Sequence, residues 1–266
     1  MTERVYAIHS DEECERLESQ ALLAPISAHL KHVPATPGAR ILDAGCGSGS
    51  MAREIARATP GATVVGVDLR DKYIDYARRR GDAEGLGNLT FEVGDVCRLP
   101  FADASFDIVW TKYLLQWVAD PMAAMREFVR ILKPGGLLVS CNFDGFAVTH
   151  EPPDPVLQPL VEYVFANLVD SFIGRKMPGM CRTAGLVDIG VEIEADRVFT
   201  IVGKIDPQRR RNWEIQWAAA HQIVTRLLGS AEMAAAYNDA FMRYQDREDT
   251  SSFCSLYVVK ARKPRA

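Results

Sequence analysis

Short apolar runs alternate with segments of helical composition along the first half of the chain. The runs are rich in valine, isoleucine and leucine, as buried strands are, and they lie at residues 39–44, 62–68, 89–93, 106–110 and 137–141. The intervening helices are expected at residues 51–59, 71–80 and 121–132, the last with Pro121 in its first turn. This alternation predicts right-handed crossovers and an α/β fold with a mostly parallel, doubly wound sheet.

The regions on either side of this alternation are mainly helical. Ser10 and Glu13 fit a capping box that opens an N-terminal helix. After the fifth run, strands are expected at residues 188–200 and 252–261, and helices at residues 175–184, 207–228 and 231–246, with Asp206 capping the second of these. Ligands of parallel sheets bind at the carboxyl ends of the strands, so residues that directly follow a strand are the first candidates for a site.

Composition and charge narrow the class of protein. The 266 residues are 48% hydrophobic and 25% charged, which is typical of a globular chain, and the net charge of −4 gives no general attraction to nucleic acid. Six scattered cysteines form no C-x-x-C pair, so no metal site and a reducing compartment are expected. With no apolar run long enough to span a membrane and no signal peptide, we expect a cytoplasmic protein.

A glycine-rich turn follows the first predicted strand. The segment LDAGCGSG at residues 42–49 places Gly45, Gly47 and Gly49 where the following helix offers free backbone N–H groups. A plain tight turn would also use glycine. However, Ser50 stands where a dinucleotide fingerprint has glycine, no P-loop lysine is present, and the carboxylate of Asp43 suits an ammonium group better than a pyrophosphate.

Two acidic residues end the next two strands. Asp68 is placed to accept hydrogen bonds from ribose hydroxyls, and Asp95 to accept one from the exocyclic amine of adenine. Either acid alone would equally be a helix cap or a surface charge. Together with the glycine turn, they predict a ligand that combines an amino acid, a ribose and an adenine.

These segments, with LKPGG at residues 132–136, resemble the class I S-adenosylmethionine-dependent methyltransferases over residues 39–144. Residues 114–121 and 174–186 are similar to the ubiquinone/menaquinone C-methyltransferase subgroup, which acts on small molecules. The resemblance implies a Rossmann-like seven-stranded sheet with an antiparallel last strand, and S-adenosylmethionine as cofactor. The implied cofactor contacts, including a lid helix at the N-terminus, are Tyr6, Gln20, Gly45, Cys46, Gly47, Asp68, Leu69, Asp95, Val96 and the carbonyl of Thr111.

Methyl transfer requires alignment of the acceptor and exclusion of water, and a general base if the acceptor is a hydroxyl or an acidic carbon. His150, which follows the fifth strand, is the first candidate for a base that also touches substrate, and Tyr113 is the second. An exposed loop histidine and a packed tyrosine are the structural alternatives. Trp213, Trp217 and His221 share one helix face, which is expected either to line an acceptor pocket or to pack in the core.

The whole chain, residues 1–266, is thus expected to be one methyltransferase domain. Its expected parts are an N-terminal helical lid at 1–33, a cofactor-binding core at 39–144, acceptor-binding insertions at 145–185 and 205–250, and a terminal strand at 251–266. The expected partner is a small apolar, aromatic or quinone-like molecule methylated at carbon, oxygen or nitrogen, and a homo-oligomer is compatible with the sequence. The fourth strand ends in TKYL rather than in the Asn/Asp-Pro-Pro-Tyr motif of nucleobase and amine methyltransferases, which argues against those acceptors.

Three other functions remain open at this point. One is a cofactor-binding enzyme that catalyses a non-methylating reaction, and another is a nicotinamide-dependent oxidoreductase, which uses the same strand-end acid. The third is a partner-binding domain without catalytic activity.

Overall fold

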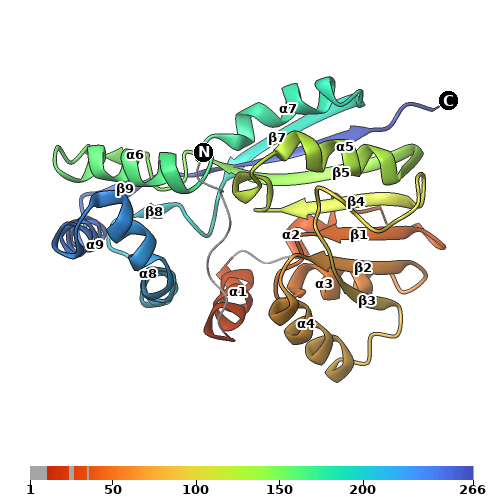
Figure 1. Cartoon of the computed structure of the whole chain (residues 1–266), viewed down its shortest axis with the longest axis horizontal. Coiled ribbons are helices and arrows are strands. Elements are labelled where there is room, and N and C mark those ends of the chain that lie inside the picture. The colour runs from red at the N-terminus through yellow and green to blue at the C-terminus, as the bar shows by residue number, and fades with distance from the viewer. Residues whose placement is uncertain (1–10, 24–26, 35, 266) are drawn as a thin grey trace.

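A seven-stranded sheet organises the chain in the computed structural model, which describes residues 11–23, 27–34 and 36–265 (Figure 1). The strand order is β3-β2-β1-β4-β5-β10-β7. The bounds are β1 Arg40–Ala44, β2 Thr63–Asp68, β3 Leu89–Val93, β4 Phe106–Lys112, β5 Leu132–Asp144, β7 Val187–Ala195 and β10 Ser255–Arg262. The first five strands pair in parallel, and β10 is antiparallel to both of its neighbours. The predicted fold class is confirmed, including the antiparallel last strand.

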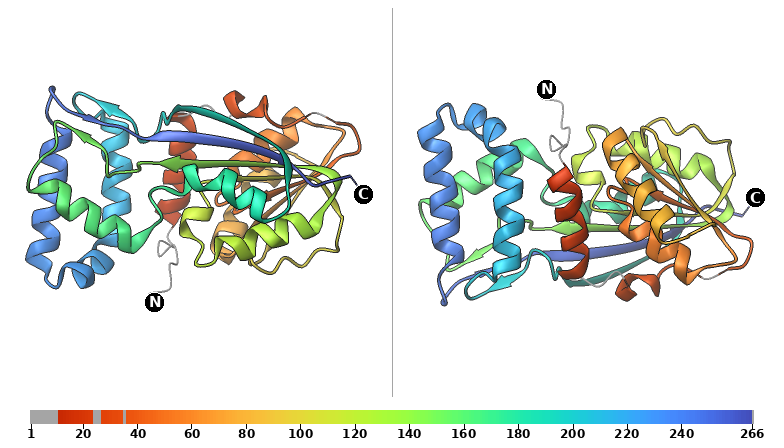
Figure 2. Two further views of the ribbon diagram at one scale, coloured as in Figure 1. Left: turned by 90° about the horizontal axis from the view of Figure 1, so that it is seen from above. Right: turned by 90° about the horizontal axis from the view of Figure 1, so that it is seen from below.

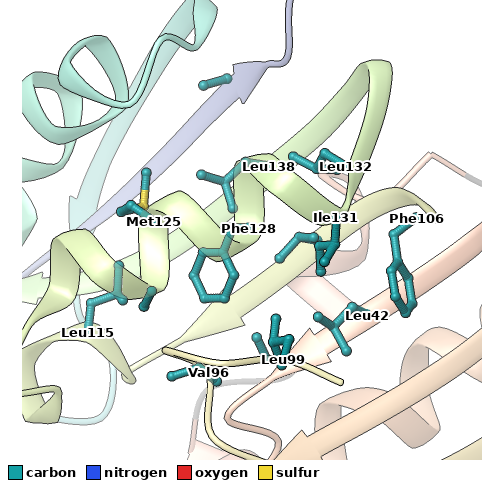
Figure 3. Packing of buried hydrophobic residues seen from close by; sticks show 14 of the residues in the cluster. Leu42, Val96, Leu99, Phe106, Leu115, Met125, Phe128, Ile131, Leu132 and Leu138 are labelled. Atoms are coloured by element: carbon teal, nitrogen blue, oxygen red, sulfur yellow. The ribbon is translucent and has the colours of Figure 1, made fainter. Parts of the chain in front are cut away.

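Helices cover both faces of this sheet. They are α3 (Ser50–Ala58) and α4 (Asp71–Ala83), which pack at the β2–β3 end, and α5 (Pro121–Ile131) and α7 (Ile173–Thr183), which pack on β5 and its neighbours. Figure 3 shows Phe128 of α5 directed toward Val96 and Leu99, in one of the clusters that form the core, to which Met125 and Leu42 also belong. As predicted, α5 begins with Pro121, and the Asp120 side chain accepts a hydrogen bond from the Ala123 N–H.

A second group of helices stands beyond one end of the sheet. It contains α6 (Leu157–Leu168), α8 (Pro207–Leu228) and α9 (Ala231–Gln245), together with a small sheet of β6 (His150–Glu151), β8 (Ile201–Val202) and β9 (Ser251–Ser252) that the sequence pattern did not predict. The predicted Asp206 cap of α8 is confirmed, because its side chain accepts from the N–H groups of Gln208 and Arg209.

The N-terminal helix α1 (Asp11–Leu23) lies between this helical group and the core in all three views (Figures 1 and 2). It packs against α8 on one side and against α3 and α4 on the other. Two short helices, α2 (Ser27–Leu30) and the 3-10 turn η1 (Leu115–Trp117), complete the elements. Ser10, the predicted cap of α1, lies outside the described residues.

The prediction of one strand over residues 188–200 was wrong. Strand β7 ends at Ala195, because the side chain of Asp196 accepts hydrogen bonds from the N–H groups of Val198 and Phe199 and turns the chain. Strand β5 begins at Leu132, earlier than residue 137, because Leu132 already pairs with Phe106 of β4; the register then shifts before Leu137 pairs with Ile108. In the described part of the chain, no helix is both long and apolar enough to cross a membrane.

Candidate active site

A cavity of about 600 Å³ opens at the carboxyl ends of the parallel strands, between the core, α1 and the second group of helices. It brings together most of the residues selected from the sequence. Those that line it are Gln20, Gly45, Cys46, Gly47, Asp68, Leu69, Asp95, Val96, Tyr113, Trp213 and Trp217. One continuous space therefore joins the predicted cofactor contacts to the predicted acceptor wall.

The glycine turn forms the floor of the cofactor half. Gly45, Gly47 and Gly49 all have positive φ, at 73°, 53° and 77°, a conformation that favours glycine. The N–H groups of Gly45 and Cys46 donate to the carbonyl of Val67 at 2.8 and 2.9 Å, which fixes the turn against β2. A Cβ on Gly45 would lie 2.6 Å from Leu114 Cδ1, so the Leu114 side chain would have to move to admit one.

Asp68, at the end of β2, lines the cavity and also accepts a hydrogen bond from the glycine turn. Its Oδ2 accepts from the Gly47 N–H at 3.0 Å and its Oδ1 from the Arg70 N–H at 3.1 Å. Burial raises the pKa of this carboxyl, while those two hydrogen bonds act in the opposite direction. Asp95 likewise accepts from the Cys97 N–H at 2.8 Å. Both carboxylates are thus oriented by backbone groups before a ligand binds.

Asp43 is a buried acid at the base of the cavity. Its side chain is only 2% exposed, and no described residue gives its Oδ2 a hydrogen bond. Burial, and then the negative charge of Asp68, raise the pKa of Asp43 to about 7. A buried carboxylate of this kind gains most from a cationic partner, so its position fits the ammonium group of an amino acid.

Aromatic side chains line the other half of the cavity. They are Phe143, Phe146, Phe165, Phe199, Trp213, Trp217 and Tyr237. The rings support one another: Phe146 and Phe199 have centroids 4.5 Å apart, and Trp213 stacks on Phe241 at 4.0 Å. The indole N–H of Trp213 donates to Asn238 Oδ1 at 2.9 Å, which leaves its ring as the apolar surface. This half suits a flat apolar molecule.

Tyr113 stands between the two halves. It follows β4 in a left-handed conformation with φ of 53°, its hydroxyl donates a short hydrogen bond to the Asp196 carboxylate, and Lys112 Nζ lies 4.8 Å from its ring centroid. Burial raises the pKa of both Tyr113 and Asp196. The sequence reasoning missed Asp196 because the strand was expected to run to residue 200. With the strand end placed at Ala195, the search for acids after strands would have found it.

His150 is not brought to this cavity. Its ring is buried against Tyr244, with centroids 4.9 Å apart, and lines a separate cavity of about 60 Å³. Its Nδ1 lies 3.0 Å from Gln158 Oε1, and the amide N–H groups of Gln158 donate to Val148 O and Glu162. His150 Nδ1 therefore carries the proton and donates it to Gln158. Burial lowers the pKa of His150, so it is a neutral, packed histidine rather than the exposed loop residue of the structural alternative.

Two further predicted residues, Thr111 and His221, do not line this cavity, and a third is not described. Thr111 is fully buried inside the sheet, because β4 continues past it to Lys112. The residues of this strand end that line the cavity are instead Lys112, Tyr113 and Leu114. His221 is exposed, with Nδ1 2.8 Å from the carbonyl of Ala218; it follows Trp217 by about one helical turn but is not among the residues that line the cavity. Tyr6 lies outside the described residues.

Helix α1 closes one side of the cavity with Arg16, Leu17, Gln20 and Ala21. Arg16 is buried and pairs with Glu13 at 2.7 Å, while its Nη1 donates to Gln20 Oε1 at 2.5 Å. Two contacts anchor the helix, one on each side. Glu18 pairs with Arg53 of α3 at 2.6 Å, and the Ser19 hydroxyl donates to Asn212 Oδ1 of α8 at 3.1 Å. No group of acidic, histidine or cysteine side chains within the described residues could hold a metal ion.

A family model described as a methyltransferase domain matches residues 42–140, the segment that carries the glycine turn and both strand-end acids. The core is a methyltransferase domain. The resemblance to the class I, S-adenosylmethionine-dependent enzymes is confirmed, and it implies S-adenosylmethionine as the cofactor of this domain. The site fits that molecule, since Asp43 supplies the buried carboxylate for its amino acid and the side-chain-free turn allows it to approach the backbone.

Curated relatives extend the comparison. Demethylmenaquinone methyltransferase of Thermus thermophilus is 36% identical over 53% of this chain and 60% of that protein. The 27-O-demethylrifamycin SV methyltransferase of Amycolatopsis mediterranei is 36% identical over 42% of this chain and 41% of that protein. An uncharacterized protein of a Streptomyces fradiae transposon is 36% identical over 60% of this chain and 46% of that protein. The methyltransferase domain thus spans about half the length of these relatives.

Solved structures share the fold. The cyclase SpnF superposes with a TM-score of 0.63 at 21% identity, over 93% of this chain and 82% of that one. Haemonchus contortus phosphoethanolamine N-methyltransferase 2, in complex with S-adenosyl-L-methionine, superposes with a TM-score of 0.60 at 20% identity, over 95% of this chain and 57% of that one. These likenesses show the fold alone.

Proposed function

We propose that this protein transfers the methyl group of S-adenosylmethionine to a small acceptor with an apolar or aromatic body. The observation that carries the proposal is the continuous 600 Å³ cavity, in which the strand-end acids and the glycine turn face an aromatic wall. The relatives named for demethylmenaquinone and demethylrifamycin support a quinone-like or natural-product-like acceptor. In this proposal the core at 39–144 binds the cofactor, residues 1–33 form the lid, and the insertions at 145–185 and 205–250 bind the acceptor.

The residues of the chain have mainly positioning roles in this reaction. When bound, the cofactor supplies an activated methyl group on a positively charged sulfur. Asp43 would hold its ammonium group, Asp68 its ribose and Asp95 its adenine. The aromatic wall aligns the acceptor for in-line attack, and α1 excludes water from the junction.

Tyr113 is the better candidate for the proton acceptor, because it lines the cavity and His150 does not. Its hydroxyl proton is already donated to Asp196, so the lone pairs of Tyr113 Oη are free to accept a proton from the acceptor as the C–O or C–C bond forms. The tyrosine proton then passes to the Asp196 carboxylate. Burial raises the pKa of Asp196 and makes that carboxylate a stronger base than one in water.

Two measurements test the function. Isothermal titration should show tight binding of S-adenosylhomocysteine and no binding of NADH, whereas the opposite result would establish the oxidoreductase. Incubation with a deuterated methyl donor and a panel of aromatic and quinone acceptors should give one CD3 group per product molecule. Conversion without label would instead establish a non-methylating reaction, such as the one for which the structural neighbour SpnF is named.

The catalytic assignment has its own pair of variants. Tyr113→Phe removes the proton acceptor but keeps the ring, so turnover of a hydroxyl acceptor should fall at least 100-fold with S-adenosylhomocysteine affinity unchanged. His150→Gln, in the separate cavity, should change turnover less than threefold. If His150→Gln is the slower variant, Tyr113 is not the base.

A further inference from the structure

Two buried polar side chains in the acceptor half have no partner within the described part of the chain. Gln116 is fully buried, and neither its Oε1 nor its Nε2 makes a hydrogen bond. Tyr237 is 1% exposed, and its hydroxyl makes none. Both side chains line the 600 Å³ cavity. This pattern matches Asp43 in the cofactor half, where the unpartnered oxygen fits a group of the bound molecule.

The two side chains reach the cavity from different parts of the fold. Gln116 lies in η1, which begins three residues after the end of β4, and its carbonyl accepts a hydrogen bond from the Asp170 N–H at 3.2 Å. Two residues earlier, Leu114 packs against Gly45 of the cofactor turn, so Gln116 lies where the two halves meet. Tyr237 belongs to α9, with its ring centroid 5.9 Å from that of Trp217, in the helical group seen at the far end of Figure 1.

A role in packing alone does not explain these residue types. Burying an amide or a hydroxyl without a hydrogen bond is unfavourable, and leucine or phenylalanine would fill the same space without that cost. A glutamine side chain offers both a donor and an acceptor, which matches a hydroxyl or an enol. A tyrosine hydroxyl can donate to a carbonyl or pair with a second hydroxyl.

The charges around the acceptor half of the cavity also limit the kind of acceptor molecule that can bind there. Every cavity-lining residue contributed by α6, α8 and α9 is uncharged; these are Val164, Phe165, Leu168, Trp213, Gln216, Trp217, Ala220, Val224 and Tyr237. The charged side chains that line the cavity come from other elements, among them Lys112 and Arg16, which is paired with Glu13. Against the wall made by α6, α8 and α9, a cationic amine or a carboxylate would have no neighbouring counter-charge, which is unfavourable. The wall therefore selects a neutral molecule.

We propose that Gln116 and Tyr237 are acceptor-binding residues that together recognise an uncharged aromatic molecule carrying oxygen substituents at two separated positions, as in a polyhydroxylated or keto-hydroxy fused-ring compound. Gln116 holds the oxygen nearer the cofactor, and Tyr237 the distal one. This assignment rests on the proposed methyl transfer and specifies its substrate class.

The test uses the full chain saturated with S-adenosylhomocysteine and two neutral probes of equal shape. In ligand-detected NMR titrations, 1,5-dihydroxynaphthalene should bind at least tenfold more tightly than 1,5-dimethylnaphthalene. Gln116→Leu and Tyr237→Phe should each weaken binding of the diol by about 3- to 10-fold, the loss expected for one hydrogen bond, and leave the dimethyl probe unchanged. Tyr163→Phe, at an exposed position outside the cavity, should change neither.

A second measurement separates ligand recognition from a structural role. Without ligand, Gln116→Leu and Tyr237→Phe should leave the melting temperature unchanged or raise it, since each removes an unpartnered buried group. Equal binding of the two probes, no binding of the diol, or lower melting temperatures with an unchanged diol preference would overturn the assignment. Because the affinity for S-adenosylhomocysteine is measured first, its absence would identify failure of the proposed function instead.

Discussion

Replacing Gly45 by alanine tests whether the cofactor turn must be free of side chains. At φ of 73° an alanine costs about 1–2 kcal/mol of stability, because the left-handed conformation brings Cβ close to the backbone. Gly85, at the end of α4, supplies the matched control: its φ is 67°, and a Cβ there would meet nothing within 4 Å. Both variants should therefore lose about 1–2 kcal/mol of unfolding free energy in urea denaturation.

Cofactor affinity should separate the two variants. The new Cβ of Gly45→Ala would lie 2.6 Å from Leu114 Cδ1, so the leucine must rotate, and both groups border the cavity. We expect the affinity for S-adenosylhomocysteine to fall about tenfold, or about 1.4 kcal/mol, in Gly45→Ala and to stay constant in Gly85→Ala. Isothermal titration measures both. Wild-type affinity in Gly45→Ala, or an equal loss in Gly85→Ala, would refute the assignment of the turn.

Two further predictions concern the acid at the base of the cavity and the anchoring of α1. Burial raises the pKa of Asp43 to about 7, so the folded chain keeps a proton that the unfolded chain releases near pH 4. The free energy of unfolding should therefore fall as the pH rises from about 4 to 7. In urea denaturation at a series of pH values, Asp43→Asn should reduce this fall. An unchanged slope would exclude Asp43 as its source. Glu18→Gln removes the ion pair with Arg53 and should speed the dissociation of S-adenosylhomocysteine several-fold in stopped-flow measurements. The control Glu12→Gln, at an exposed position of the same helix, should leave the dissociation rate unchanged. Equal rates in the two variants would show that the ion pair does not hold α1.

The cofactor half was predictable because its signals are local. An apolar run, a glycine turn and a helix follow one another within about 20 residues, and the acids Asp68 and Asp95 lie at or just after the ends of their strands. Parallel pairing then brings these strand ends to one edge without further information. The number of strands and the antiparallel last strand came from the resemblance rather than from the pattern, and the order of the strands was not predicted.

The acceptor half was less predictable because its contacts are between distant segments. Tyr113 and Asp196 are 83 positions apart, and their hydrogen bond depends on the exact residue at which β7 ends. His150 follows β5 in sequence, as expected, but its pairing with Gln158 holds it in a separate cavity. For Gln116, the missing signal was burial, since a glutamine in a turn near the surface would need no ligand.

Helix α1 also has a kinetic consequence. Its contacts with Arg53 and Asn212 attach the same helix to the core and to the second helical group, and it closes the cavity along a side that both halves share. A displacement of α1 that exposes the cofactor therefore exposes the acceptor as well. For the proposed methyl transfer, we therefore expect the methylated product and the spent cofactor to leave in a single opening event, whose frequency would set an upper limit on turnover.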